Sequence, residues 1–281
     1  MGTMENNPAA LKIGPKKRTW MMLTVELLAA FLERIAPLRL AEDWDNVGLL
    51  VGDPRSPVRR VMTCLTITPQ VAAEAIEQNA DLIVAHHPLP FQPLQRVTPE
   101  TPTGRMLLDL IAARIAVYSA HTAYDSATDG INQRLARGLG LRGVFPLTFS
   151  AGGIGAGRIG WFEEPIRLGE LAETVKGFLR LQRVQIVGAA DQMVRMAAVA
   201  CGAAGAFLEH ARQADCDAML LGETRYHTYL EAEAAGIGLI LPGHYASERF
   251  AMECLADILA GEFSALDVWA SRSECDPVRW V

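Results

Sequence analysis

The sequence lacks the features that would mark a membrane or secreted protein. Its 281 residues include no uninterrupted apolar run near the ~20 residues that a membrane-spanning helix needs. The five cysteines are scattered and form no Cys-x-x-Cys pair, which argues against a disulfide framework and against a thiolate zinc site. The basic residues at 16–18 are not followed by the apolar segment of a signal peptide. We therefore predict a cytoplasmic protein that does not bind membranes.

Positive charge is also scarce. The chain has 26 lysines and arginines against 32 aspartates and glutamates, so its formal net charge is −6. This balance gives no general electrostatic attraction for nucleic acid, which we consider an unlikely partner. Half of the residues are hydrophobic and 21% are charged, which is typical of a globular protein with one large or two ordinary domains.

Predicted strands and helices alternate along the chain, which favours an α/β fold with two halves and largely parallel sheets. In the first half an amphipathic helix at 27–35 precedes strands at 58–67, 81–85 and 115–119, with helices between them. In the second half we predict strands at 158–162, 183–188, 195–201, 217–221 and 237–241, and helices at 168–179, 205–214, 225–235 and 245–260. The expected division is a disordered extension at 1–22, a first half at 23–142, a glycine-rich linker at 143–157, a second half at 158–270 and a tail at 271–281.

Three of the predicted strands end on side chains that bind metals. Functional groups of open α/β sheets gather beyond the carboxyl ends of the strands. After the strand at 81–85, Pro88 turns the chain out of the sheet, so two adjacent imidazoles can face one cavity. The other two ends each carry a histidine and a carboxylate four residues apart, the spacing that shares a helix face. The three groups are His86 with His87, His121 with Asp125, and His244 with Glu248.

Imidazole and carboxylate ligands without thiolate suit zinc, iron, manganese, cobalt or nickel. Five or six ligands exceed the three protein ligands of a typical catalytic zinc, so two ions that share a carboxylate explain the number better. Each group also has a structural interpretation. The histidine pair can be exposed, His121 and Asp125 can orient each other, and His244 with Glu248 can be a surface pair worth only ~0.3–0.5 kcal/mol. The coincidence of all three groups at strand ends favours the metal site.

Two weaker patterns remain. Residues 155–160 match Gly-x-Gly-x-x-Gly but precede a strand instead of opening a helix, so we predict no dinucleotide cofactor. His227 has Glu231 four residues later, and this pattern fits an acid/base group that faces a substrate as well as it fits a pair on a helix surface.

Five stretches carry a family resemblance. In chain order they are AEDWDNVGLLVGD, ADLIVAHHPLPFQPLQRVT, VYSAHTAYDSATDGINQRLA, LLGETRYHTYLEA and LPGHYASERFAMECL. With them the chain resembles the GTP cyclohydrolase I type 2 family, also called Nif-three-like or dinuclear metal centre hexameric proteins, over most of residues 23–260. The segment at 143–157 is short, so the chain looks like the form without the inserted domain of many bacterial relatives.

The resemblance implies a ring-shaped homohexamer with two divalent metal ions per chain in the cleft between the halves. It assigns His121 and His227 to positions close to the metals, where they are candidate catalytic groups. The metal ligands that it implies are His86, His87, Asp125, His244 and Glu248, with Glu248 as the bridge.

We accordingly predict a dinuclear metal-dependent hydrolase that uses a metal-bound hydroxide on a purine nucleotide or a phosphoester. The sequence does not separate these two substrates. The alternative is a non-enzymatic metal-binding scaffold or metal-handling protein that acts through partners.

Overall fold

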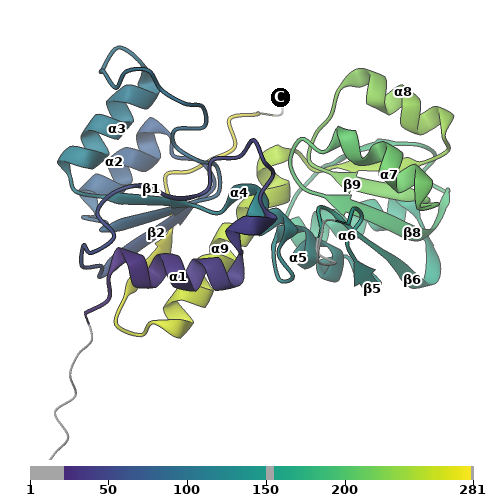
Figure 1. Ribbon diagram of the computed structural model, residues 1–281. Coiled ribbons are helices and arrows are strands. Elements are labelled where there is room, and N and C mark those ends of the chain that lie inside the picture. Colours follow the sequence, from purple (N-terminus) through teal and green to yellow (C-terminus); the bar gives the residue numbers. More distant parts are fainter. Residues whose placement is uncertain (1–21, 150–154, 280–281) are drawn as a thin grey trace, which may run out of the picture.

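Two β-sheets lie side by side in the computed structural model, which describes residues 22–149 and 155–279 (Figure 1). In the first sheet, three of the four strand pairings are parallel and only the pairing of β1 with β4 is antiparallel. Its strands, in spatial order, are β1 (Gly48–Val51), β4 (Ala116–Ser119), β3 (Leu82–Ala85), β2 (Arg60–Cys64) and β11 (Asp267–Ala270).

The second sheet is mixed, whereas we expected it to be largely parallel. Only the pairings of β9 with β8 and with β10 are parallel. Several β6 residues are exposed, as is common in antiparallel sheets with one face toward water. The strand order is β5 (Arg142–Phe145), β6 (Arg158–Arg167), β8 (Met193–Ala200), β9 (Ala218–Leu221), β10 (Gly238–Leu241) and β7 (Gln185–Val187). The predicted α/β class is confirmed.

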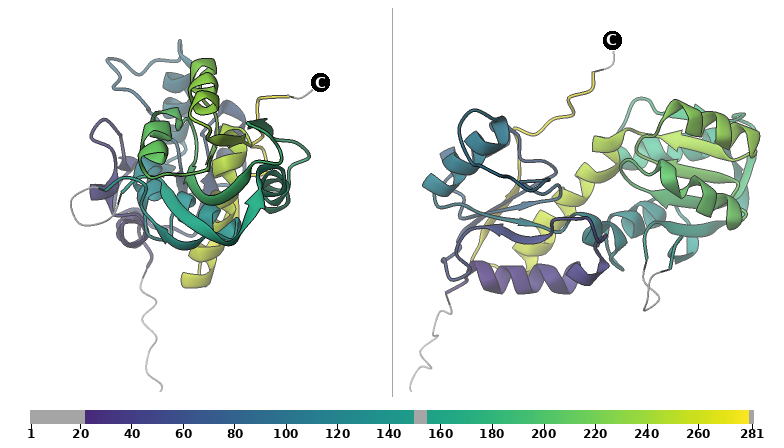
Figure 2. Two further views of the ribbon diagram at one scale, coloured as in Figure 1. Left: turned by 90° about the vertical axis from the view of Figure 1, so that its right-hand side faces the viewer. Right: turned by 45° about the horizontal axis from the view of Figure 1, so that its top comes forward.

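Helices cover both faces of the first sheet (Figures 1 and 2). On one face, α2 (Pro69–Glu77) and α3 (Pro102–Ala112) form an apolar cluster with the strands. Each of these helices begins after a threonine cap with proline at its first position, the local signal of a helix start. On the other face, α1 (Val25–Ile35) and α9 (His244–Glu262) contribute to a separate cluster.

The largest apolar cluster extends across both sheets. It takes side chains from α1, from α9, and from the helices α5 (Ile131–Gly138) and α6 (Leu168–Leu179) against the second sheet. The opposite face of the second sheet packs against α7 (Leu208–Gln213) and α8 (Tyr226–Ala234). The remaining short elements are η1 (Leu38–Leu40), α4 (His121–Ser126) and η2 (Gly205–Phe207). The two halves therefore share one core.

Helix α9 connects the halves. It begins directly after β10 of the second sheet and ends before β11, which pairs in parallel with β2 of the first sheet (Figure 2). Residues 267–270 therefore lie in the first sheet, although we placed them in the second half. A four-residue edge strand is too short to show a clear period in the sequence. Likewise, β5 extends to Phe145, inside the predicted linker, and pairs with β6.

Most of the predicted extension at 1–22 lies outside the described residues. Within the described ranges, no helix combines the length and the apolar character needed to cross a membrane.

Candidate metal centre

The three ligand-bearing strand ends meet between the two sheets. His86 and His87 follow β3, His121 begins α4 immediately after β4, and His244 begins α9 after β10. Asp125 and Glu248 lie one helical turn further along α4 and α9. A pocket of about 870 Å³ is lined by His87, His121, Asp125, His244 and Glu248. His86 does not line it but is buried next to Asp125.

The Glu248 carboxylate lies at the centre of this group. Its Oε2 is 3.2 Å from His87 Nε2 and 3.1 Å from His244 Nε2, and its Oε1 is 3.9 Å from His86 Nε2. Gly202 makes this position possible, because a Cβ there would lie 2.3 Å from Glu248 Oε1. The φ angle of Gly202, +66°, also belongs to the left-handed region that glycine adopts most readily. One carboxylate thus contacts histidines from both sheets, as a bridging ligand requires.

His86 is the side chain that most clearly requires a further partner. Its side chain is completely buried, and neither ring nitrogen has a hydrogen-bond partner among the described residues. Its Nε2 lies 3.6 Å from Asp125 Oδ1. An unpaired polar group in the interior costs free energy, and a coordinated cation removes that cost. The residues present therefore fit a bound divalent metal.

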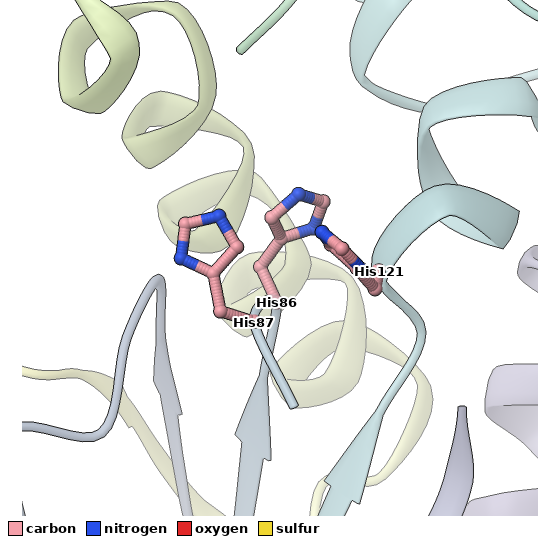
Figure 3. A group of neighbouring side chains, drawn as sticks. All are labelled: His86, His87 and His121. Atoms are coloured by element: carbon pink, nitrogen blue, oxygen red, sulfur yellow. The ribbon is translucent and has the colours of Figure 1, made fainter. Parts of the chain in front are cut away.

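Two sets of ligand atoms are close enough to hold ions. In each set, all atoms lie within 4.8 Å of one another, and His87 belongs to both. One set is His86, His87 and His121, whose rings Figure 3 shows at the ends of two adjacent strands. The other is His87, His244 and Glu248. His121 thus lies as close to His86 and His87 as a third ligand would, whereas the predicted ligand Asp125 belongs to neither set.

Each of three histidines is held through its Nδ1 atom. His121 Nδ1 is 2.7 Å from Asp45 Oδ1, and His244 Nδ1 is 2.9 Å from Glu223 Oε1. The third contact joins His87 Nδ1 to the Thr66 hydroxyl at 2.7 Å. Such contacts fix the ring and leave Nε2 for a metal or a substrate.

These three partners of the histidines were not predicted from the sequence. Asp45 stands in the resembling stretch AEDWDNVGLLVGD, but its partner His121 is 76 positions away in the chain. Thr66 and Glu223 are each 21 positions from the histidine that they contact, and no local spacing indicates such a pair.

The centre has two edges, one at the first sheet and one at the second. Burial and neighbouring charges shift the pKa values of histidine and carboxylate in opposite directions at these two edges. At the first sheet, burial lowers the pKa of His86, and burial together with Glu248 raises the pKa of Asp125 to about 7. At the second sheet, hydrogen bonding to Glu248 raises the pKa of His244 to about 9. Burial opposes ionisation of Glu248, but hydrogen bonds with His244 and His87 keep its pKa below the usual range.

Cys201 is a pocket residue that sequence reasoning also missed. Its thiol donates a hydrogen bond to Asp125 Oδ1 at 3.1 Å, and burial followed by the Asp125 charge raises the thiol pKa. Cys201 is therefore a neutral donor that positions Asp125, in agreement with a ligand set without thiolate.

The structure does not bring His227 to this pocket. It is exposed near the start of α8, and its ring lies 6.1 Å from that of Tyr226, measured between centroids. Within one chain, His121 is the predicted acid/base residue that lines the pocket.

The fold and the site together define a two-sheet α/β protein with a histidine–carboxylate cluster between its sheets. The profile of the Duf34/NIF3 (NGG1p interacting factor 3) family matches residues 23–277, and the chain belongs to this family. The resemblance inferred from the sequence is confirmed.

Individual relatives match nearly full length. The chain is 33% identical over 267 residues to a GTP cyclohydrolase 1 type 2 homolog of Clostridium acetobutylicum, covering 92% of this chain and 100% of that protein. It is 34% identical to the protein NIF3 homolog of Schizosaccharomyces pombe, covering 89% and 96%. The crystal structure of a Bacillus cereus protein related to NIF3 superposes with a TM-score of 0.84 at 23% identity, covering 92% and 99%, and supports the fold.

Proposed function

We propose that the chain is a dinuclear metal-dependent hydrolase. The carrying observation is the buried, unpartnered imidazole of His86, placed beside the carboxylates of Asp125 and Glu248. Bound divalent ions would supply a water of lowered pKa and a positive charge that polarises the electrophile. The residues that would hold them are His86, His87, Asp125, His244 and Glu248.

His121 is the proton-transfer group in this proposal. Its Nδ1–H donates to Asp45, so Nε2 is left to accept or deliver a proton in the pocket. Burial opposes the charged form of His121, yet the hydrogen bond with Asp45 and the charge of Asp125 raise its pKa. The imidazolium is therefore accessible near neutral pH, as a group that cycles between acid and base requires.

Exposed aromatic rings beside His121 favour a substrate with a planar heterocycle. Trp44 and Phe91 are 61% and 48% exposed, and their ring centroids are 6.2 Å apart. Both rings lie within 5.9 Å of the His121 ring, centroid to centroid. The Asn46 side chain donates to the Pro90 carbonyl at 2.8 Å and so ties the two aromatic loops together. Among the two predicted substrates, this stacking surface supports a purine nucleotide.

The primary test is metal content per chain, measured by elemental mass spectrometry on untagged protein purified without chelator. A nucleotide turnover screen for formate and phosphate accompanies it. We expect about two metals per chain, their loss in Asp125→Ala, and metal-dependent product release. Two metals without turnover would favour the scaffold alternative, and absence of metal after reconstitution would overturn the proposal.

The substrate assignment has its own test. Replacing Trp44 with leucine removes a stacking surface worth about 1–3 kcal/mol per base. With GTP as substrate, KM should rise at least about fivefold, while metal content and kcat are retained. An unchanged KM would show that the base does not stack on Trp44.

We also propose the ring-shaped homohexamer that the family resemblance implies. Light scattering coupled to size-exclusion chromatography tests it against the chain mass of 30.5 kDa. A monomer at micromolar concentration would contradict it.

A further inference from the structure

A second cavity, separate from the metal pocket, lies along another face of α9. It measures about 1140 Å³ and runs between α5, α6, the segment after α6, α9 and the chain after β11. Tyr245 and Arg249 of α9 line it, whereas His244 and Glu248 of the same helix turns line the metal pocket. We call this second cavity the arginine groove.

Positive charge is concentrated in the arginine groove, although the whole chain has a net charge of −6. Two acidic side chains, Glu253 and Asp276, line it as well. Its arginines are Arg134, Arg137, Arg180, Arg183, Arg249 and Arg279. Since the composition is acidic overall, the excess of guanidinium groups in the arginine groove is local and does not follow from the net charge of the chain.

Several of these arginines are available to a ligand. Arg180 and Arg279 are exposed, and neither forms an ion pair with another described residue. Arg137 contacts Asp129 at 2.7 Å, but both side chains are about 60% exposed, so water screens this pair. In contrast, Arg249 is buried and its Nε lies 2.8 Å from Glu274, so Arg249 is held as part of the groove floor.

An aromatic surface adjoins the charged groups. Phe178 is 36% exposed and packs against Gly138, where a Cβ would lie 2.3 Å from the ring. The Phe250 ring supports it in an edge-to-face contact with centroids 5.3 Å apart. Phe178 is thus fixed two residues before Arg180, so a ring-stacking surface and a phosphate-binding guanidinium occur together.

We infer that the arginine groove binds a nucleoside diphosphate or a closely related phosphorylated nucleoside. Arg180 and Arg279 contact the phosphates, since guanidinium groups match phosphate oxygens in charge and geometry. Phe178 contacts the base. The volume suffices for one such ligand. This site is independent of the metal pocket and of any hydrolytic activity there.

Titration calorimetry with ADP tests the site on the full chain and on an Asp125→Ala variant. We expect the groove to bind ADP with equal affinity in both, because Asp125 lies in the other pocket, and the Asp125→Ala chain reports on the groove without the metals of that pocket. The double variant Arg180→Glu/Arg279→Glu should bind at least about tenfold more weakly. The matched control is Arg96→Glu, an exposed arginine outside the groove, which should bind as the unmodified chain does.

Other outcomes would overturn the inference. Loss of binding in Asp125→Ala with retention in the double variant would place ADP in the metal pocket, and no binding to the unmodified chain would eliminate the site. If the double variant does not match the thermal melting of the control, single Arg180→Gln is used, with a smaller loss expected. If the chain binds no metal, the expected results for ADP binding to the groove do not change. The groove proposal and the hydrolase proposal can therefore be overturned independently.

A second titration, with inorganic pyrophosphate, tests the contribution of the base. ADP should bind about tenfold more tightly than pyrophosphate, and Phe178→Leu should weaken ADP binding alone. Equal affinity for the two probes would overturn the nucleoside assignment.

Discussion

The two edges of the metal pocket balance their charges differently. At the first sheet, the His86 side chain is completely buried and that of Asp125 is 19% exposed, and burial disfavours the charged form of each. At the second sheet, His244 and Glu248 form an ion pair at 3.1 Å. The first edge therefore depends on an added cation for its carboxylate to ionise readily, whereas the second edge neutralises itself. A metal must replace the proton that Asp125 retains at the first edge and the more tightly held proton on His244 at the second.

The largest expected effect comes from the carboxylate that joins the edges. Glu248→Gln removes the charge that contacts histidines from both sheets, so at least one metal per chain should be lost after dialysis. Elemental mass spectrometry measures the number of metals per chain. Glu253→Gln is the matched control, because Glu253 is exposed on the same helix and its ion-pair contact with Arg249 is 3.5 Å long. An unchanged stoichiometry in Glu248→Gln would rule out the bridge.

The next largest effect is expected in the pH dependence of folding stability of the metal-free chain, which should distinguish the two edges of the pocket. The Asp125 pKa rises from 3.8 to about 7, mainly through burial, so the folded chain retains a proton that the unfolded chain releases. Stability should therefore fall as pH increases through this window. Hydrogen bonding to Glu248 raises the pKa of His244 from 6.5 to about 9. The stabilisation by protonated His244 is fully present below pH 6.5 and is lost as the pH rises through about 9.

Urea unfolding midpoints in the presence of chelator measure both windows. Asp125→Asn should flatten the lower window, and His244→Gln should flatten the upper one. Above the Asp125 window, which ends at about pH 7, a His244→Gln variant that still loses stability up to about pH 9 would contradict the assignment of the upper window to His244.

Local sequence signals predicted the parts of the centre that are local in the chain. Strand β3 ends just before His86, and β10 ends shortly before His244. Both are apolar four-residue strands that are buried along their whole length, and such runs are recognisable in sequence. The i,i+4 spacing of His244 and Glu248 then predicted a shared face of α9, and the 3.1 Å contact between them agrees.

Contacts between distant segments were not predictable. The carboxylate of Asp45 acts on a histidine 76 positions later, and β11 pairs with β2, where Asp267 is opposite Arg60 although 207 positions separate them. Neither leaves a periodic trace, because each joins segments that are far apart in the chain and meet only when the first sheet has formed. The same limit applies to His227, whose spacing with Glu231 fitted a surface pair as well as a site, and which is exposed.

A smaller effect is expected when the residue that holds His121 is changed. The Asp45 side chain is completely buried against His121 and accepts a hydrogen bond from the Thr122 backbone at 3.1 Å. Asp45→Asn keeps the shape but removes the charge, so the pKa of His121 should fall and turnover should decrease about 10–100-fold. The acid limb of the pH–rate profile should move to lower pH, with metal content retained. A profile that does not move would remove His121 from the proton-transfer step.

The smallest effect is expected at the corresponding position of the second edge. Glu223 contacts His244 Nδ1 at 2.9 Å, but its side chain is 59% exposed, whereas that of Asp45 is fully buried. Water screens an exposed carboxylate, and Glu248 already contributes more than Glu223 to the raised pKa of His244. Glu223→Gln should therefore weaken metal binding by less than about tenfold, as measured by competition with a chelator. If its effect equalled that of Glu248→Gln, the second edge would depend on Glu223 for its charge balance, and the contrast between a dependent and a self-neutralising edge would fail.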